Sequence, residues 1–228
     1  MKKEIKNAIV WGDSVAKGVI LDEARGRYSL APHNAVSIVS EGLGIKIQNR
    51  ARMGYTSKEG VAMMQKDLKK GLHADAAILE FGGNDCDFDW KAISEAPDSL
   101  HLPKTSAAEY ESNMRQMIGA AKNAGMEPIL VNLTPVNAQQ YFQFISRNGL
   151  SQENILRWLG DVFQIYRYQE SYSMIVSRLA RECGCRLLDI RSAFLHVWDC
   201  TSTLFCRDGI HPTAEGQRLI GQSILASI

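Results

Sequence analysis

Ile5 to Trp11 (IKNAIVW) is the stretch that decides the fold, because this short, mostly apolar run ends directly before Gly12, Asp13 and Ser14. A run of this length that ends at a turn residue is typical of a buried strand of a parallel sheet. Ser14 would then lie just beyond the carboxyl end of the strand. In an open α/β sheet, ligands bind outside that end.

Further short apolar runs follow, and longer helical patterns separate them. They are Ile45 to Asn49, Ala76 to Phe81, Pro128 to Leu133 and Arg186 to Ile190, each followed by Gly, Asn, Asp, Thr or Pro. Strands that alternate with helices indicate βαβ units and a parallel sheet. The sequence therefore predicts an α/β fold, a three-layer α/β/α sandwich around a five-stranded parallel sheet.

Two helix starts carry the pattern of a capping box, in which two side chains satisfy free backbone N–H groups at the helix end. The pairs are Thr56 with Glu59 and Ser106 with Glu109. The second of these helices is expected to end near Gly125. The last helix of the chain is predicted to begin after Pro212, which suits a first helical turn, and to run to about Ser227.

Composition restricts the classes of protein to consider. The 228 residues fit one domain, 1–228. A formal net charge of +1 gives no excess of positive charge with which to bind nucleic acid or an anionic membrane. We find no signal peptide and no segment of membrane-spanning length, so we expect no membrane span. The five cysteines are odd in number and lack Cys-x-x-Cys spacing, which argues against disulfides or a zinc site and for a cytoplasmic protein with reduced thiols.

One long segment, 137–168, does not fit the simple alternation of strands and helices. Long connections of this kind are often functional. Its aromatic side chains could line an acyl pocket, form a lid or make a subunit contact, or the segment could be a helical insertion that packs its own small core. The aromatics are Tyr141, Phe142, Phe144, Trp158, Phe163, Tyr166 and Tyr168.

Polar residues stand at the predicted strand ends in a combination that suits acyl transfer. Ser14 supplies a hydroxyl nucleophile, and Asp208 with His211 supplies a base and its orienting carboxylate. Gly54 and Asn84 are candidate positions for hydrogen-bond donors to a tetrahedral oxyanion. Glycine permits close backbone approach to a carbonyl, and the Asn amide remains a donor at any working pH.

These blocks resemble those of the SGNH hydrolases, the GDSL-type esterase and lipase family, in order and over essentially the whole chain. The matching residues are Gly12-Asp13-Ser14-Val15, Gly54, Gly82-Gly83-Asn84-Asp85 and Asp208-Gly209-Ile210-His211. The resemblance implies the flavodoxin-like SGNH fold. It also implies that Ser14 attacks, His211 transfers protons, Asp208 orients His211, and Ser14, Gly54 and Asn84 form the oxyanion hole. Val15 stands where the family name has Leu, and segment 137–168 is not a defining block of the family.

Each piece has an ordinary structural explanation when taken alone. Ser14 would be a helix cap, Gly54 a turn glycine, Asn84 part of a tight loop, and Asp208 with His211 a polar turn before a helix. Their joint occurrence at predicted strand ends favours catalysis.

Two other motifs fail on their spacing. The segment from Asp85 to Asp89 opens like a calcium loop, but Trp90 and Ala96 stand where that loop needs Gly and Glu. Gly12 to Gly18 lacks the Lys and Ser/Thr of a phosphate-binding loop. We therefore expect no metal and no cofactor.

The sequence thus predicts a serine esterase acting on short-chain or acetyl esters, with acetylated carbohydrate among the candidates, through an acyl-enzyme. Asp13, Tyr141, Phe142 and Phe144 are substrate-binding candidates. Two alternatives stay open: an acyltransferase or O-acetyltransferase with the same residues, and a flavodoxin-like module that binds a small anion without chemistry. The expected partner is a small ester. The sequence does not indicate an oligomeric state, and a homo-oligomer is compatible with it.

Overall fold

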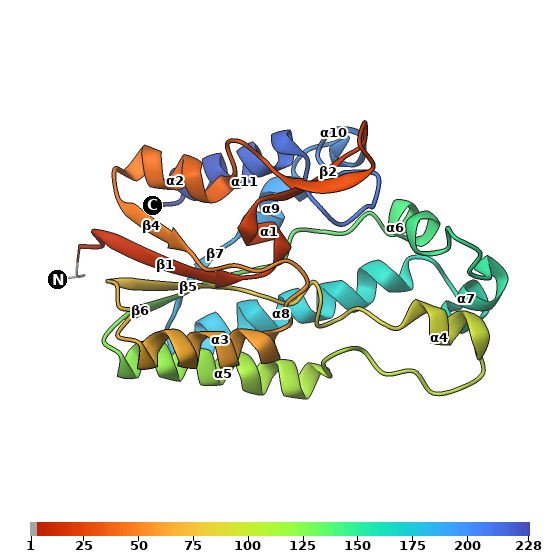
Figure 1. Cartoon of the computed structure of the whole chain (residues 1–228), viewed down its shortest axis with the longest axis horizontal. Helices are drawn as coiled ribbons and strands as arrows, with labels where there is room; N and C mark the ends of the chain where they lie inside the picture. The colour runs from red at the N-terminus through yellow and green to blue at the C-terminus, as the bar shows by residue number, and fades with distance from the viewer. Residues whose placement is uncertain (1–3) are drawn as a thin grey trace.

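The computed structural model describes residues 4–228, and the side chains of these residues other than 201 and 202. Within that range, five parallel strands form one sheet in the order β4-β1-β5-β6-β7 (Figure 1). Their bounds are β1 Asn7–Gly12, β4 Lys46–Asn49, β5 Ala76–Glu80, β6 Glu127–Val131 and β7 Arg186–Leu188. The predicted α/β fold with a five-stranded parallel sheet is confirmed.

Helices cover both faces of the sheet (Figure 1). One face carries α2 Ala35–Leu43, α9 Ile190–Leu195 and α11 Ala214–Ala226, and the other carries α3 Ser57–Lys69, α5 Ala107–Asn123 and α8 Gln164–Cys183. Because the sheet is buried on both sides, its strands are apolar on both faces, which explains the continuous run from Ala8 to Trp11. The short helices α1 Ser14–Lys17 and α10 Cys200–Thr203 complete the body.

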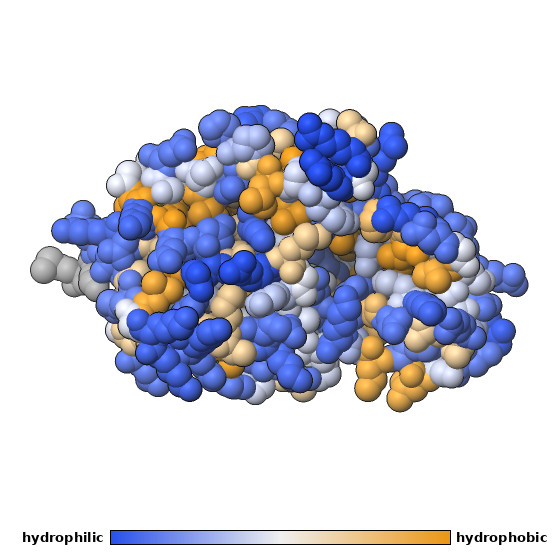
Figure 2. Space-filling model, viewed as in Figure 1, coloured by the Kyte–Doolittle hydropathy of each residue, from blue (hydrophilic) through white to orange (hydrophobic). Residues whose placement is uncertain are grey.

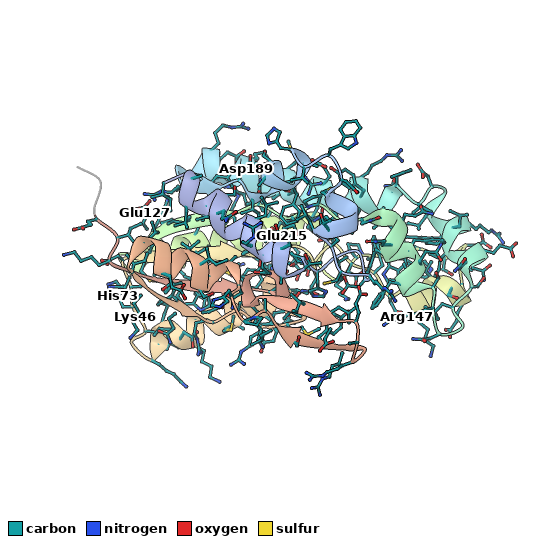
Figure 3. The ribbon with its side chains drawn as sticks, turned by 90° about the horizontal axis from the view of Figure 1, so that it is seen from above. Lys46, His73, Glu127, Arg147, Asp189 and Glu215 are labelled. Carbon is teal, nitrogen blue, oxygen red and sulfur yellow. The ribbon has the colours of Figure 1, made fainter. Side chains whose placement is uncertain are left out.

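A lobe extends beyond the carboxyl ends of the strands. It consists of α4 Trp90–Glu95, α6 Ala138–Ile145, α7 Gln152–Leu159 and the first turns of α8 (Figure 1). Arg147 lies in this lobe, whereas Lys46, His73 and Glu127 lie at the opposite end of the molecule, where the strands begin (Figure 3). The lobe has its own core, which includes Ile155 and is completed by α4. Segment 137–168 is therefore largely helical.

A two-stranded antiparallel hairpin, β2 Val19–Asp22 and β3 Arg27–Leu30, was not expected from the sequence. It follows α1 directly, and Ala31 N donates to Gly18 O at 2.8 Å. The backbone N–H of Leu21 also contacts Cys206 Sγ at 3.4 Å. The hairpin is thereby held against the loop that precedes the last helix.

The predicted helix starts agree with the structure, and α11 begins after Pro212 as expected. Both hydrogen bonds of the capping box join Thr56 and Glu59, and Ser106 Oγ accepts a hydrogen bond from Glu109 N at 3.2 Å. Pro212, however, does not lie in the first turn of α11. Thr213 caps that helix, since its Oγ1 accepts from Gly216 N at 3.1 Å, and Pro212 instead pairs with Phe205 in an isolated β-bridge. Among residues 4–228, no helix combines the length and apolar composition needed to cross a membrane.

Candidate active site

Ser14 begins the short helix α1, immediately after β1. The side chain of Asp13 caps this helix, because its Oδ1 accepts from Val15 N at 2.9 Å. Gly18 ends the helix with a left-handed φ of 82°. The Ser14 residue is 7% exposed and borders a cavity. A rigid strand and a capped turn therefore fix the position of this hydroxyl.

Asp208, His211 and Ser14 form a continuous chain of hydrogen bonds. His211 Nδ1 lies 2.7 Å from Asp208 Oδ2, and His211 Nε2 lies 2.9 Å from Ser14 Oγ. The carboxylate can only accept, so Nδ1 carries the proton, and Nε2 is left to accept the hydrogen of the Ser14 hydroxyl. The fold thus places an imidazole base against a hydroxyl that lies 197 positions away in the sequence.

The carboxyl group of Asp208 is held ionised by its neighbours. Burial alone would raise its pKa, but hydrogen bonds from the His211 ring and from the backbone N–H groups of Ile210 and His211 outweigh burial and lower it. Asp208 is fully buried. It can therefore orient the imidazole and stabilise the positive charge that develops on it.

The Asp208–His211 loop depends on Gly209. This residue has φ +74°, and a Cβ there would lie 2.6 Å from Tyr141 N and 2.7 Å from Asn137 O. Its own carbonyl accepts from Asn137 N at 2.8 Å. The loop is therefore docked on the first turn of α6, so the lobe and the catalytic candidates form one packed unit.

Tyr28, on β3, is a site residue that sequence reasoning missed. Burial raises the pKa of its phenol, as do the charge of Asp208 and a hydrogen bond to it. The Tyr28 ring lies 5.0 Å from the His211 ring, centroid to centroid. The only sequence signal was the alternation of polar and apolar residues from Arg27 to Leu30, directly after Gly26.

Gly54 and Asn84 lie beside Ser14 on the wall of the same cavity. Gly54 has φ +80°, a backbone conformation that residues with a side chain rarely adopt, and it is exposed to the cavity. Asn84 Nδ2 donates to Tyr55 O at 3.0 Å. That bond uses one amide hydrogen and ties Asn84 to the Gly54 loop, while the second amide hydrogen is available to a ligand.

A pair of buried carboxyl groups, Asp13 and Glu80, lies next to the Ser14 turn. Burial, followed by the charge of Glu80, raises the pKa of Asp13 well above its usual range, and burial also raises the pKa of Glu80. The pKa values of both carboxyl groups are raised, and a hydrogen bond between two carboxyl groups requires one proton, so the pair shares a proton. Glu80 Oε2 also accepts from Ala16 N at 3.1 Å. The pair therefore satisfies two adjacent backbone N–H groups, those of Val15 and Ala16, at the start of α1. A Glu in an otherwise apolar strand was its sequence signal.

The cavity next to Ser14 has a volume of about 680 Å³ and runs from the triad into the lobe. Figure 2 shows hydrophobic side chains gathered on the lobe. Of the substrate-binding candidates, Asp13 and Tyr141 border the cavity. The structure does not bring the other two there: Phe142 is buried in the lobe core, and Phe144 lies under the guanidinium of Arg147, with 3.4 Å from Cζ to the ring centroid.

The sequence also matches a known family. The profile of the GDSL-like lipase/acylhydrolase family matches residues 10–219. The chain belongs to this family. The resemblance drawn from the four sequence blocks is confirmed, and this GDSL hydrolase is an enzyme of the acylhydrolase class.

Solved structures share the fold of this GDSL hydrolase at low sequence identity. A lipase/acylhydrolase from Enterococcus faecalis has a TM-score of 0.65 at 18% identity, over 98% of this chain and 95% of that chain. LAE5, an α/β hydrolase from the metagenome of Lake Arreo, has a TM-score of 0.66 at 19% identity, over 97% of this chain and 94% of that chain. Axe2, an acetylxylan esterase from Geobacillus stearothermophilus, has a TM-score of 0.64 at 17% identity, over 97% of this chain and 93% of that chain. No curated protein sequence matches the chain.

Proposed function

We propose that this GDSL hydrolase cleaves carboxylic esters through an acyl-enzyme formed on Ser14. The hydrogen-bonded chain from Asp208 through His211 to Ser14, at the wall of a ligand-sized cavity, carries the proposal. Each of the three side chains has the hydrogen-bond partner that its role needs. The proposal needs no cofactor.

In the first half of the reaction, His211 Nε2 removes the Ser14 hydroxyl proton as Oγ attacks the ester carbonyl carbon. The resulting imidazolium is stabilised by Asp208, which remains ionised. The carbonyl oxygen becomes an oxyanion. The backbone N–H groups of Ser14 and Gly54 and the free amide hydrogen of Asn84 are its proposed donors.

Collapse of this intermediate breaks the bond between the carbonyl carbon and the alcohol oxygen. His211 gives its proton to that oxygen, so the alcohol leaves and the acyl group stays on Ser14 Oγ. In the second half, His211 takes a proton from water, the hydroxide oxygen attacks the acyl carbon, and the proton returns to Ser14 Oγ. The products are the alcohol and the carboxylic acid, and the enzyme is restored.

Turnover of ethyl acetate and ethyl butyrate, followed by acid release, tests the proposal. We expect Ser14→Ala to lower kcat by at least about 10⁴-fold, because it removes the nucleophile. Ser99→Ala is a matched control on an exposed loop and should retain the wild-type rate. Turnover that survives Ser14→Ala would exclude Ser14 as the nucleophile.

The same acyl-enzyme could be captured by an alcohol or sugar in place of water. Product analysis in the presence of ethanol, glycerol or glucose separates these outcomes. We expect the free acid as the main product. An acylated acceptor that dominates at millimolar acceptor would instead make the protein an acyltransferase.

A further inference from the structure

The cavity continues from Ser14 into the lobe as an aromatic chamber, lined by Phe88, Trp90, Tyr141, Trp158 and Tyr168. The Phe88 ring lies 4.9 Å from Trp158 and 5.1 Å from Tyr168, centroid to centroid. Trp90 and Tyr141 meet edge to face at 6.1 Å. Phe88, Trp158 and Tyr168 are only half-buried, so part of each ring faces the chamber.

One polar cluster on the wall of the aromatic chamber is engaged within the protein. Asp87 accepts from Trp90 Nε1 at 2.8 Å, from Tyr141 OH at 2.6 Å and from Lys104 Nζ at 2.8 Å. Because these groups satisfy one another, this part of the wall presents mainly the carbon surface of the rings to a ligand.

Gln169, deeper in the same cavity, is engaged in the same way. Its Nε2 donates to Thr134 O at 2.7 Å, and its Oε1 accepts from Arg191 Nη1 at 3.0 Å. Both ends of the amide are thereby used within the protein. A sugar beside Asp87 and Gln169 would find their polar atoms already paired, and burying unpaired hydroxyls is costly, whereas an apolar group carries no such cost.

The size of the cavity also exceeds what a small acyl group fills. Its volume of about 680 Å³ lies in the range of pockets that bury whole drug-sized ligands. An acetyl group would occupy only the part beside Ser14. Apolar surface buried against the rings would add binding energy that an acetyl group cannot supply.

We infer that the aromatic chamber binds an extended apolar or aromatic group of the ester, on either its acyl or its alcohol side. This inference rests on the proposed function, because Ser14 marks where the ester bond lies. The chamber then makes the enzyme selective for esters with one bulky apolar arm.

Two isomeric esters, ethyl hexanoate and hexyl acetate, test the inference against ethyl acetate. They carry the same apolar content on opposite sides of the ester bond. Each fully buried methylene is worth about a factor of four in binding, so we expect kcat/KM for one isomer to exceed that of ethyl acetate by about tenfold or more. Preference for ethyl hexanoate assigns the chamber to the acyl side, and preference for hexyl acetate assigns it to the alcohol side. Equal kcat/KM for all three esters would overturn the inference while leaving the proposed function intact.

A matched pair of variants on one loop locates the effect. Leu102 borders the cavity and is 70% exposed, whereas Leu100 is 86% exposed and does not border it. Leu102→Asp places a charge at the chamber and should lower the ratio of kcat/KM for the preferred isomer over ethyl acetate by about threefold or more. Leu100→Asp should keep the wild-type ratio. Equal ratios in both variants would contradict the assignment.

Binding to Ser14→Ala gives a readout that does not depend on turnover. Trp90 and Trp158 line the aromatic chamber, while Trp11 is fully buried in the core and Trp198 is fully exposed. We expect titration with the hexyl and hexanoyl isomers to change tryptophan fluorescence saturably, at lower concentration than ethyl acetate does. No saturable change would overturn the inference, even if Ser14 proved not to be catalytic.

Discussion

At the residue scale, the contact between Asp208 and His211 decides whether the imidazole can act as a base. Asp208→Asn leaves the shape of the side chain nearly unchanged, but its amide favours the wrong tautomer of His211. We expect kcat for ethyl acetate to fall by roughly 10³- to 10⁴-fold. Asparagine retains an oxygen that can accept from Ile210 N and His211 N, so the midpoint of urea unfolding should move little. A variant with near wild-type kcat would show that Asp208 does not orient His211.

Asn84 tests the proposed oxyanion hole. Replacement by Ala removes the amide donor, which is commonly worth about 3 kcal/mol of transition-state stabilisation. We expect kcat to fall by roughly 10²-fold with little change in KM, since the interaction strengthens only as charge develops. Because the half-buried side chain also bonds to Tyr55 O, a thermal melt should accompany the kinetics. A rise in KM with unchanged kcat would assign Asn84 to ground-state binding.

The Asp13–Glu80 pair predicts a pH dependence of stability. The raised pKa values of the two carboxyl groups mean that the folded protein holds a proton between Asp13 and Glu80 which the unfolded chain has lost above about pH 4. The folded state therefore binds more protons, and the stability from this proton is lost as pH rises through the raised pKa of Asp13. Asp13→Asn mimics the protonated acid at all pH values.

Urea unfolding from pH 5 to pH 9 checks this prediction. The free energy of unfolding of wild type should fall relative to that of Asp13→Asn as pH increases. If the difference stayed constant across the range, Asp13 would not carry the shared proton.

At the element scale, the loop before α11 is fixed by its docking on α6. A Cβ at Gly209 would meet the backbone of Asn137 and Tyr141 and would also require a left-handed φ. Gly184 has φ +62° but open space around it, so Gly184→Ala measures the cost of the backbone conformation alone, about 1 kcal/mol. We expect Gly209→Ala to lower the free energy of unfolding by more than that, and to lower kcat as His211 shifts. Equal costs at the two positions would show that the loop does not need this close contact.

The elements that were predictable from sequence are those with a local signal. Each apolar run beginning near Ala8, Ala76 or Arg186 became a parallel strand, because a strand buried on both faces cannot be polar on either. The capping residues Thr56 and Ser106 marked helix starts for an equally local reason. The hairpin that carries Tyr28 was missed, because its four-residue strands are only partly buried and lack a strong alternation.

At the scale of the whole molecule, it was predictable that the polar residues after the strands would lie close together, because the carboxyl ends of parallel strands meet at one edge of the sheet. That rule brings Ser14, Gly54 and Asn84 together. It does not place His211, which follows α10 and returns over the sheet from the loop before α11. The spacing of Asp208 and His211 marked the pair as a candidate base, and the family resemblance supported its assignment to Ser14.

The aromatic chamber was only partly predictable from the sequence. The segment 137–168 both packs a core and lines the cavity, so the two explanations considered for it are not exclusive. Tyr141 borders the cavity, whereas its neighbour Phe142 packs in the lobe core, a difference that sequence alone does not show. Phe88 and Trp90, from a different part of the chain, complete the wall.

Covalent trapping of the acyl group tests the central claim most directly. Wild type mixed with ethyl hexanoate, quenched in acid within milliseconds and digested, should show the mass of one hexanoyl group on the peptide that contains Ser14. Ser14→Ala treated in the same way should show none. Rapid turnover with no acyl group on Ser14 at any quench time, or an acyl group on another residue, would contradict the acyl-enzyme mechanism.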